Sequence, residues 1–119
     1  MGRRVLVVDD QPGIRKLLEE LFKREGFEVA LACDGRQAIE EVRKAVPDVV
    51  VMDMKMPNMN GLEAAEEILN LNGNISIVLI TAYGEAELIE KARQIGVKEY
   101  IVKPFDIFVL RDKVAGLIA

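Results

Sequence analysis

The sequence contains no histidine and no tryptophan, and Cys33 is its only cysteine. Without a second cysteine the chain cannot form an internal disulfide framework, and thiolate or imidazole metal sites are excluded with it. Every catalytic triad that depends on histidine is excluded as well. Any chemistry in this chain must therefore use carboxylates, hydroxyl groups and lysine.

The chain also has no long apolar run and no excess of positive charge. Its apolar runs are far shorter than the roughly 18 residues that span a bilayer, and no signal-peptide pattern opens the sequence. A net charge of -4 and a pI near 4.9 supply no basic field that would attract nucleic acid or anionic lipid. We expect a cytoplasmic protein that neither binds nucleic acid directly nor associates with a membrane.

The composition is that of a folded globular domain. Half of the 119 residues are hydrophobic and 30% are charged, and no low-complexity segment or linker divides the chain. This length suffices for one hydrophobic core but not for two ordinary ones. We predict a single domain over residues 1–119.

Five short apolar runs are typical of buried strands. They lack a strict alternation of apolar and polar residues, which indicates that both faces of each strand are covered. The five predicted strands are Val5–Val8, Phe27–Ala32, Val49–Met52, Ile75–Ile80 and Tyr100–Val102.

Segments with apolar residues at helical spacing separate these strands. The second of them carries Ala38, Ile39, Val42 and Val46. Three glycines follow helical segments, at positions where a left-handed cap would end a helix; they are Gly26, Gly73 and Gly96. Strict alternation of strand and helix predicts an α/β fold, a three-layer sandwich with a doubly wound, five-stranded parallel sheet between two layers of helices.

Polar residues stand where the predicted strands end. Asp9 and Asp10 follow the first strand, Asp53 follows the third, Thr81 the fourth and Lys103 the fifth. Ligands of such sheets bind beyond the carboxyl ends of the strands, where the strand order reverses. With strand order 2-1-3-4-5, all five side chains would share one edge of the sheet.

Three carboxylates at one edge would repel one another. Two unit charges about 4 Å apart interact by roughly 4 kcal/mol at an effective dielectric constant near 20. Lys103 supplies one compensating charge, and a divalent cation bound through oxygen ligands would supply two more. We therefore predict a Mg²⁺ site at Asp9, Asp10 and Asp53.

A carboxylate beside such a cation can attack phosphorus without a general base. Asp53 is predicted to be the nucleophile and to form an aspartyl phosphate. Lys103 and the Thr81 hydroxyl would stabilise the transferring phosphoryl oxygens. The histidine that this chain lacks could be supplied by a partner that donates the phosphoryl group.

The combination of Asp9, Asp10, Asp53, Thr81 and Lys103 resembles the receiver domains of two-component response regulators, the CheY-like family, from about Arg4 to the last residue. The resemblance implies strand order 2-1-3-4-5 and transfer of a phosphoryl group from a sensor histidine kinase to Asp53. It implies further that Asp10, Asp53 and the backbone carbonyl of Lys55 ligate Mg²⁺, with Asp9 acting through water.

The resemblance also implies a conformational switch. Thr81 and Lys103 would each contact a phosphoryl oxygen, and the bond from Lys103 to Pro104 would be cis, a conformation nearly confined to proline. Tyr100 occupies the family's switch-aromatic position, where it would turn inward after Thr81 moves and alter the face made by the fourth helix, fifth strand and fifth helix. The alternative is that Tyr100 is simply a half-buried aromatic residue of its strand, with no role in switching.

Within the family, segments such as "DDQPGIRKLLEELFKREGF", "TAYGE" and "KPFDI" are most similar to a single-domain phosphorelay intermediate. This resemblance implies a stand-alone receiver that passes its phosphoryl group to a histidine phosphotransferase. A partner-docking surface would then lie at Gln11, Pro12, Gly13 and Ile14. Two bulky residues, Lys55 and Tyr83, flank the expected path of water to the acyl phosphate, so we predict slow hydrolysis.

Several alternatives remain open at this stage. The chain could be a receiver cut from a longer DNA-binding transcription activator, or a degenerate receiver that acts by contact alone. A flavodoxin-like FMN module would share the sheet, but the two acids after the first strand would repel its phosphate. A haloacid-dehalogenase-type phosphatase needs a second acid two residues after the nucleophile, where this chain has Lys55. Phosphorylation and dephosphorylation at Asp53 would modify the chain itself. The sequence therefore does not decide whether the protein counts as an enzyme.

Overall fold

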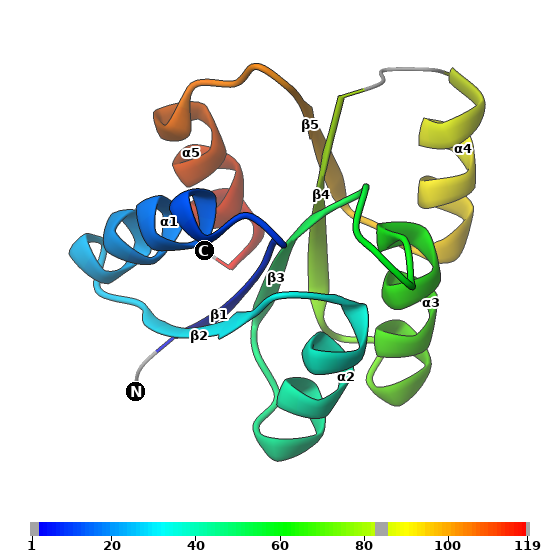
Figure 1. Ribbon diagram of the computed structural model, residues 1–119, viewed down its shortest axis with the longest axis horizontal. Helices are drawn as coiled ribbons and strands as arrows, with labels where there is room; N and C mark the ends of the chain where they lie inside the picture. Colours follow the sequence, from blue (N-terminus) through cyan, green and yellow to red (C-terminus); the bar gives the residue numbers. More distant parts are fainter. Residues whose placement is uncertain (1–2, 83–85, 119) are drawn as a thin grey trace.

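The computed structural model describes residues 3–82 and 86–118. Strands and helices alternate along this part of the chain (Figure 1). The strands are β1 (Arg4–Val8), β2 (Glu28–Ala32), β3 (Val49–Asp53), β4 (Ser76–Thr81) and β5 (Glu99–Val102). The helices are α1 (Pro12–Arg24), α2 (Gly35–Lys44), α3 (Gly61–Leu71), α4 (Ala86–Ile95) and α5 (Ile107–Leu117).

The five strands form one parallel sheet in the order β2-β1-β3-β4-β5, which confirms the predicted fold class and strand order. The chain leaves β1 toward α1 on one face and leaves β3 toward α3 on the other, as Figure 1 shows. The carboxyl ends of β1 and β3 are therefore the switch point of the sheet. The strand limits differ from the predicted ones by at most one residue at each end.

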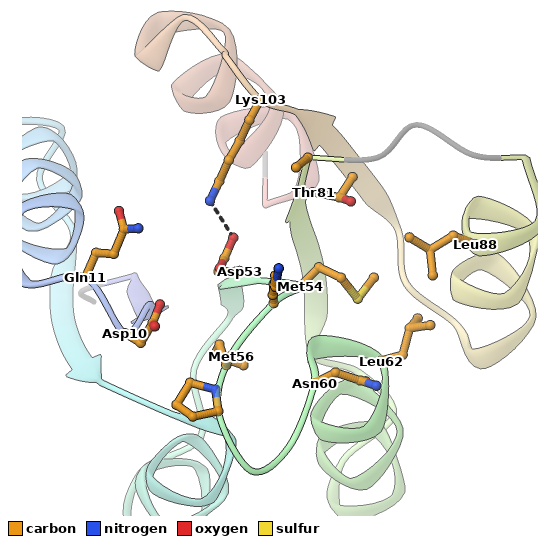
Figure 2. A pocket seen from close by; sticks show the side chains of 13 residues that line it. Asp10, Gln11, Asp53, Met54, Met56, Asn60, Leu62, Thr81, Leu88 and Lys103 are labelled. Carbon is orange, nitrogen blue, oxygen red and sulfur yellow. Dashed lines mark ion pairs between the residues drawn. The ribbon is translucent and has the colours of Figure 1, made fainter.

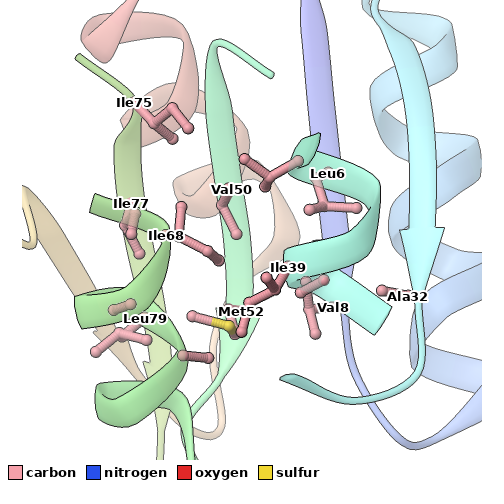
Figure 3. Close-up of a cluster of buried hydrophobic side chains, with 14 of the residues drawn as sticks. Leu6, Val8, Ala32, Ile39, Val50, Met52, Ile68, Ile75, Ile77 and Leu79 are labelled. Carbon is pink, nitrogen blue, oxygen red and sulfur yellow. The ribbon is translucent and has the colours of Figure 1, made fainter. Parts of the chain in front are cut away.

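Successive strand residues point to opposite faces and build two cores. On one face the strand residues pack against α1 and α5; this core includes Val5, Val7, Phe22, Leu110 and Val114. On the other face they pack against α2, α3 and α4, and Figure 3 shows part of this core, including Leu6, Val50, Met52, Ile68 and Leu79. Buried side chains on both faces explain why the strands lack a polar alternation.

The structure corrects two details of the predicted helices. The second helix ends at Lys44, before Val46, whose side chain is 55% exposed. Pro47 explains this end, because a proline disfavours helical backbone in the residue before it. Gly73 does not have the expected left-handed conformation; α3 ends at Leu71, and the capping residue Asn72 already has extended backbone. Gly26 and Gly96 do have positive φ angles, of 89° and 114°, as predicted.

The methionines of β3 and of the loop after it pack into the hydrophobic core. Met52 and Met56 are buried, while Met54 and Met59 are partly buried against the same core. Within residues 3–82 and 86–118, no helix has the length and apolarity needed to cross a bilayer.

We predict that Phe22→Ala lowers the free energy of unfolding by about 3 to 5 kcal/mol. Phe22 is fully buried beneath the sheet, and its ring meets Phe27 edge to face at 5.7 Å between centroids. Urea unfolding followed by circular dichroism measures the change. Phe108→Ala is the matched control, since this ring is 53% exposed and should cost no more than about 1 kcal/mol. Equal losses in the two variants would contradict this description of the core.

Candidate functional site

Three carboxylates meet at the switch point of the sheet. Asp9 and Asp10 follow β1 directly, and Asp53 is the last residue of β3. One oxygen of each carboxylate lies within 4.8 Å of an oxygen of the others. The pairing of Val8 with Met52 in the β1–β3 ladder explains this proximity, because the acids are the next residues of both strands.

Lys103, the first residue after β5, reaches this cluster from the far side of β4. Its Nζ atom lies 2.9 Å from Oδ1 of Asp53, the contact drawn as a dashed line in Figure 2. Its backbone N–H donates to the carbonyl of Thr81 at 2.8 Å, which fixes the end of β5 against the end of β4. Burial lowers the pKa of Lys103, but the hydrogen bond and charge of Asp53, together with Asp9 and Asp10, more than offset this and raise it. The lysine is therefore cationic at neutral pH.

Asp9 is the most deeply buried of the acids, at 1% exposure. Its N–H donates to the carbonyl of Ala32 at 3.1 Å, and its Oδ1 accepts from the N–H of Gln11 at 2.9 Å. Its carbonyl accepts from Nη1 of Arg15 at 2.6 Å. Among the buried side-chain nitrogen and oxygen atoms of the described residues, only its Oδ2 has no hydrogen-bond partner. Burial is the main cause that raises the pKa of Asp9, and the negative charge of Asp53 adds to it.

The donor set of this cluster fits a hard divalent cation. All candidate ligand atoms are carboxylate oxygens, which suit Mg²⁺ and not a soft metal. The buried Oδ2 of Asp9 is an unsatisfied acceptor, and buried polar atoms normally have a partner. A cation in this cluster, directly or through a water that it binds, would supply the missing partner and reduce the repulsion among the acids.

A cleft of about 840 Å³ opens over the acidic cluster. Figure 2 shows Asp10, Gln11, Asp53 and Lys103 along one part of it. Apolar side chains that include Met54, Met56, Leu62 and Leu88 also line the cleft and are called its apolar wall; Figure 2 shows Leu62 and Leu88 on the side away from Asp10. Thr81, 3% exposed, and the exposed Lys55 also line the cleft. The space exceeds that of a single phosphoryl group, so part of a partner can enter it.

The remaining predicted residues belong to β5, to the loop after it and to the start of α1, or lie outside the described chain. The Lys103–Pro104 peptide bond is cis, as expected. Tyr100 is on β5 opposite Leu79, and its side chain is 38% exposed. Tyr83 lies outside the described residues. The residues of the predicted docking surface lie at the start of α1 and just before it. Gln11, Pro12 and Gly13 are exposed, and Ile14 is partly buried.

Sequence reasoning did not identify Arg15 or the apolar wall of the cleft. The sequence does contain a signal for Arg15, because it lies four residues, about one helical turn, after Gln11. At that spacing a long cationic side chain lies on the same face of the helix as the acidic loop before it and can reach that loop. The wall could not be found in this way, because Leu62 and Leu88 belong to different helices and share no sequence pattern. Only the packing of α3 near α4 brings them together.

A doubly wound sheet with three acids, a threonine and a lysine at the carboxyl ends of its strands defines a receiver-type signalling domain. The sequence model of the response regulator receiver domain matches residues 5–115, and the chain belongs to this family. It is therefore a response regulator receiver of two-component signalling, as its sequence predicted.

Named relatives agree with this assignment. The chain is 42% identical over 114 residues to sporulation initiation phosphotransferase F of Bacillus subtilis, covering 96% of this chain and 92% of that protein. It is also 42% identical to chemotaxis protein CheY of Thermotoga maritima, over 88% of each chain. Among solved structures, response regulator TrrA of Thermotoga maritima, in complex with Mg²⁺ and BeF, matches with a TM-score of 0.86 and 37% identity, covering 97% of this chain and 98% of that one.

We predict that Asp9→Asn stabilises the protein when no divalent cation is present. A carboxyl with a raised pKa keeps its proton in the folded state at pH values where the unfolded chain has lost it. Its contribution to stability is therefore lost as the pH rises from the ordinary value of 3.8 through the raised one. The neutral amide avoids this loss and can donate to Asp53, so we expect a gain of about 1 to 3 kcal/mol at pH 7.

Urea unfolding in excess EDTA, at pH 7 and at acidic pH, measures this effect. The difference between Asp9→Asn and the wild type should shrink toward acidic pH. Asp112→Asn is the control, since its carboxylate is 71% exposed and should show little change at either pH. A wild type more stable than Asp9→Asn at pH 7 in EDTA would contradict the description of Asp9 as an unsatisfied buried charge.

Proposed function

We propose that this receiver accepts a phosphoryl group on Asp53, with Mg²⁺, from the phosphohistidine of a sensor histidine kinase. One observation carries the proposal: the carboxylate of Asp53 is 6% exposed, is held by Lys103 at 2.9 Å and lies in the same cluster as Asp9 and Asp10. A nucleophile, a compensating cation and a set of metal ligands thus share one end of the cleft.

Mg²⁺, when bound, supplies the positive charge that allows an anionic carboxylate to approach an anionic phosphoryl group. The carboxylates of Asp10 and Asp53 and the backbone carbonyl of Lys55 would hold it, with Asp9 acting through water. The fit of oxygen ligands and the unsatisfied Oδ2 of Asp9 support this assignment.

Asp53 acts as the nucleophile. A carboxylate oxygen forms a bond to phosphorus while the bond from phosphorus to the donor's imidazole nitrogen breaks, and that nitrogen keeps the electron pair. The ammonium group of Lys103 exchanges its contact with Asp53 for one with a phosphoryl oxygen. The Thr81 hydroxyl donates to another phosphoryl oxygen. Lys103 and Thr81 therefore both stabilise the negative charge on the oxygens of the phosphoryl group while it is transferred.

The switch follows from the movement of Thr81. Thr81 pairs with Val102 in the β4–β5 ladder, and Tyr100 is two residues earlier on β5. Movement of the Thr81 hydroxyl toward the phosphoryl group would vacate space beside β5, into which the ring of Tyr100 turns. The exposed fraction of that ring, 38%, leaves it room to become more buried. The surface of α4, β5 and α5 would then change.

Docking of the donor would use Gln11, Pro12, Gly13 and Ile14, which follow Asp10 in the chain and of which Gln11 lines the cleft. The likeness to sporulation initiation phosphotransferase F supports a relay, in which a histidine phosphotransferase receives the phosphoryl group next. The alternative, a receiver from a longer transcription activator, is not better supported by these likenesses.

We predict that incubation with acetyl phosphate and Mg²⁺ adds one phosphoryl group, and that Asp53→Ala adds none. Intact-mass spectrometry measures the addition, and EDTA should abolish it in the wild type. Asp112→Asn is the control, because it removes an exposed carboxylate far from the cleft. A phosphoryl group retained by Asp53→Ala would assign the acceptor elsewhere and refute the proposal.

We predict further that the aspartyl phosphate is lost slowly, over many minutes in the presence of Mg²⁺. Lys55 is exposed at the rim of the cleft, where its side chain can hinder the water that attacks phosphorus. Phosphorylated protein freed of donor and sampled by mass spectrometry gives the half-life. Lys55→Ala should shorten it, whereas Lys91→Ala, an exposed lysine of α4, should not. A wild-type half-life of seconds would disprove this prediction.

A further inference from the structure

Gly61 approaches the backbone of the phosphoacceptor more closely than any other residue type could. It is the first residue of α3 and is buried. A Cβ atom at this position would lie 2.9 Å from the carbonyl oxygen of Asp53 and 2.9 Å from Cα of Met54. Cβ atoms essentially never approach other heavy atoms below 3.0 Å, and neither of these backbone atoms can rotate away.

The same residue closes the loop that follows β3. The N–H of Gly61 donates to the carbonyl of Met54 at 2.8 Å, and the N–H of Met54 donates to the carbonyl of Ile80 at 2.8 Å. The first bond ties the start of α3 to the residue after Asp53, and the second ties that residue to β4. We call this arrangement of Gly61 and Met54 the neck of the β3–α3 loop.

The loop beyond the neck has little freedom to absorb a displacement. Its turn at Asn58 has a positive φ of 71°, and the N–H of Met59 donates to the carbonyl of Pro57 at 2.8 Å. Met59 also contacts Gly35 so closely that a Cβ atom there would lie 2.9 Å from its sulfur. A shift at the neck therefore has to pass to the backbone of Asp53 or to Lys55, the next residue along the loop.

We infer that Gly61 is a positioning residue for phosphoryl transfer: its missing side chain lets the neck hold Asp53 and Lys55 where their oxygens can share one Mg²⁺ ion. The inference rests on the proposed function, because it assigns Mg²⁺ to these residues. The requirement is for space, since the φ angle of Gly61 is not positive. Alanine would therefore act by pushing Asp53 away and not by straining its own backbone.

Gly61→Ala tests the inference. Residues that support metal ligands typically change metal affinity 10- to 100-fold when mutated, so we expect the dissociation constant for Mg²⁺ to rise about tenfold. Calorimetric titration with Mg²⁺ measures it on the unphosphorylated protein, without any need for turnover. The rate of phosphorylation by acetyl phosphate at a fixed, subsaturating Mg²⁺ concentration should fall in parallel, and saturating Mg²⁺ should restore part of it.

Two other glycines provide matched controls. Gly116→Ala adds a methyl group within α5 where no heavy atom lies within 4 Å, so Mg²⁺ affinity should stay at the wild-type value. Gly26→Ala forces alanine to a φ of 89° after α1, far from the cleft, so it should lower Tm without changing Mg²⁺ affinity. The second control separates loss of stability from loss of positioning.

The outcomes distinguish this inference from the proposed function. A wild type that neither binds Mg²⁺ nor is phosphorylated refutes the function itself. A wild type that binds Mg²⁺, beside a folded Gly61→Ala with the same affinity, overturns only the role of Gly61. If Gly61→Ala folds poorly, the double variant with Gly116→Ala restores stability, since alanine favours the interior of a helix.

A measurement on the wild type decides the matter if both variants fail to fold. Coupling between two equilibria is reciprocal, so a neck that promotes Mg²⁺ binding must itself be stabilised by Mg²⁺. Hydrogen exchange of the Gly61 amide, which bonds to Met54, should therefore slow on addition of Mg²⁺ more than exchange of the Gly116 amide. Equal exchange of the Gly61 amide with and without Mg²⁺ would overturn the inference.

Discussion

The site depends on electrostatic repulsion that the hydrophobic core prevents from relaxing. Asp9 and Asp53 continue strands that are buried on both faces, so these two acids cannot move far apart unless β1 and β3 separate. Each close pair of charges costs roughly 4 kcal/mol at a separation of about 4 Å. Domains of this size are stable by only about 5 to 15 kcal/mol. The contact of Lys103 with Asp53 therefore offsets part of this repulsion when no metal is bound.

The acids differ in how the fold satisfies them. Asp53 has a cationic partner, and the exposed Asp10 can be solvated. Asp9 is buried with its backbone N–H, carbonyl and Oδ1 all hydrogen-bonded, and its Oδ2 is the one buried side-chain oxygen or nitrogen of the described residues without a partner. A rigidly held carboxylate with one unsatisfied oxygen can accept a cation without reorganisation. The fold thus concentrates its electrostatic cost at the point where the proposed Mg²⁺ would remove it.

Much of the fold could be predicted because local patterns determined it. Runs such as Val49–Met52 lack polar positions, and this identified them as strands covered on both faces. The rule that ligands bind at the carboxyl ends of parallel strands then predicts that Asp9 and Asp53 lie together. These inferences need only the order of residues along the chain.

The features that were missed depend on distances between segments. Gly73 follows a helix just as Gly26 does, yet the last turn of α3 ends in extended backbone, and no pattern at the glycine distinguishes the two cases. The contact of Gly61 with Asp53 depends on how α3 approaches β3. The bond from Arg15 to Asp9 depends on the rotamer of a long side chain. The periodicity of the sequence contains no information on how closely two segments approach or on which rotamer a side chain adopts.

The hydrogen bonds at the ends of β4 and β5 explain how a change at Asp53 can reach a surface. Lys103 can release Asp53 by moving its ammonium group alone, because its N–H remains bonded to the carbonyl of Thr81. Thr81 in turn pairs with Val102, which is 37% exposed on the outer strand. Thr81 and Lys103, the two residues that would contact a phosphoryl group, are thus joined by a hydrogen bond between their backbones. Their side chains can therefore move without separating β4 from β5. A change confined to side chains at the ends of β4 and β5 favours an effect on nearby Tyr100 over a rearrangement of the sheet.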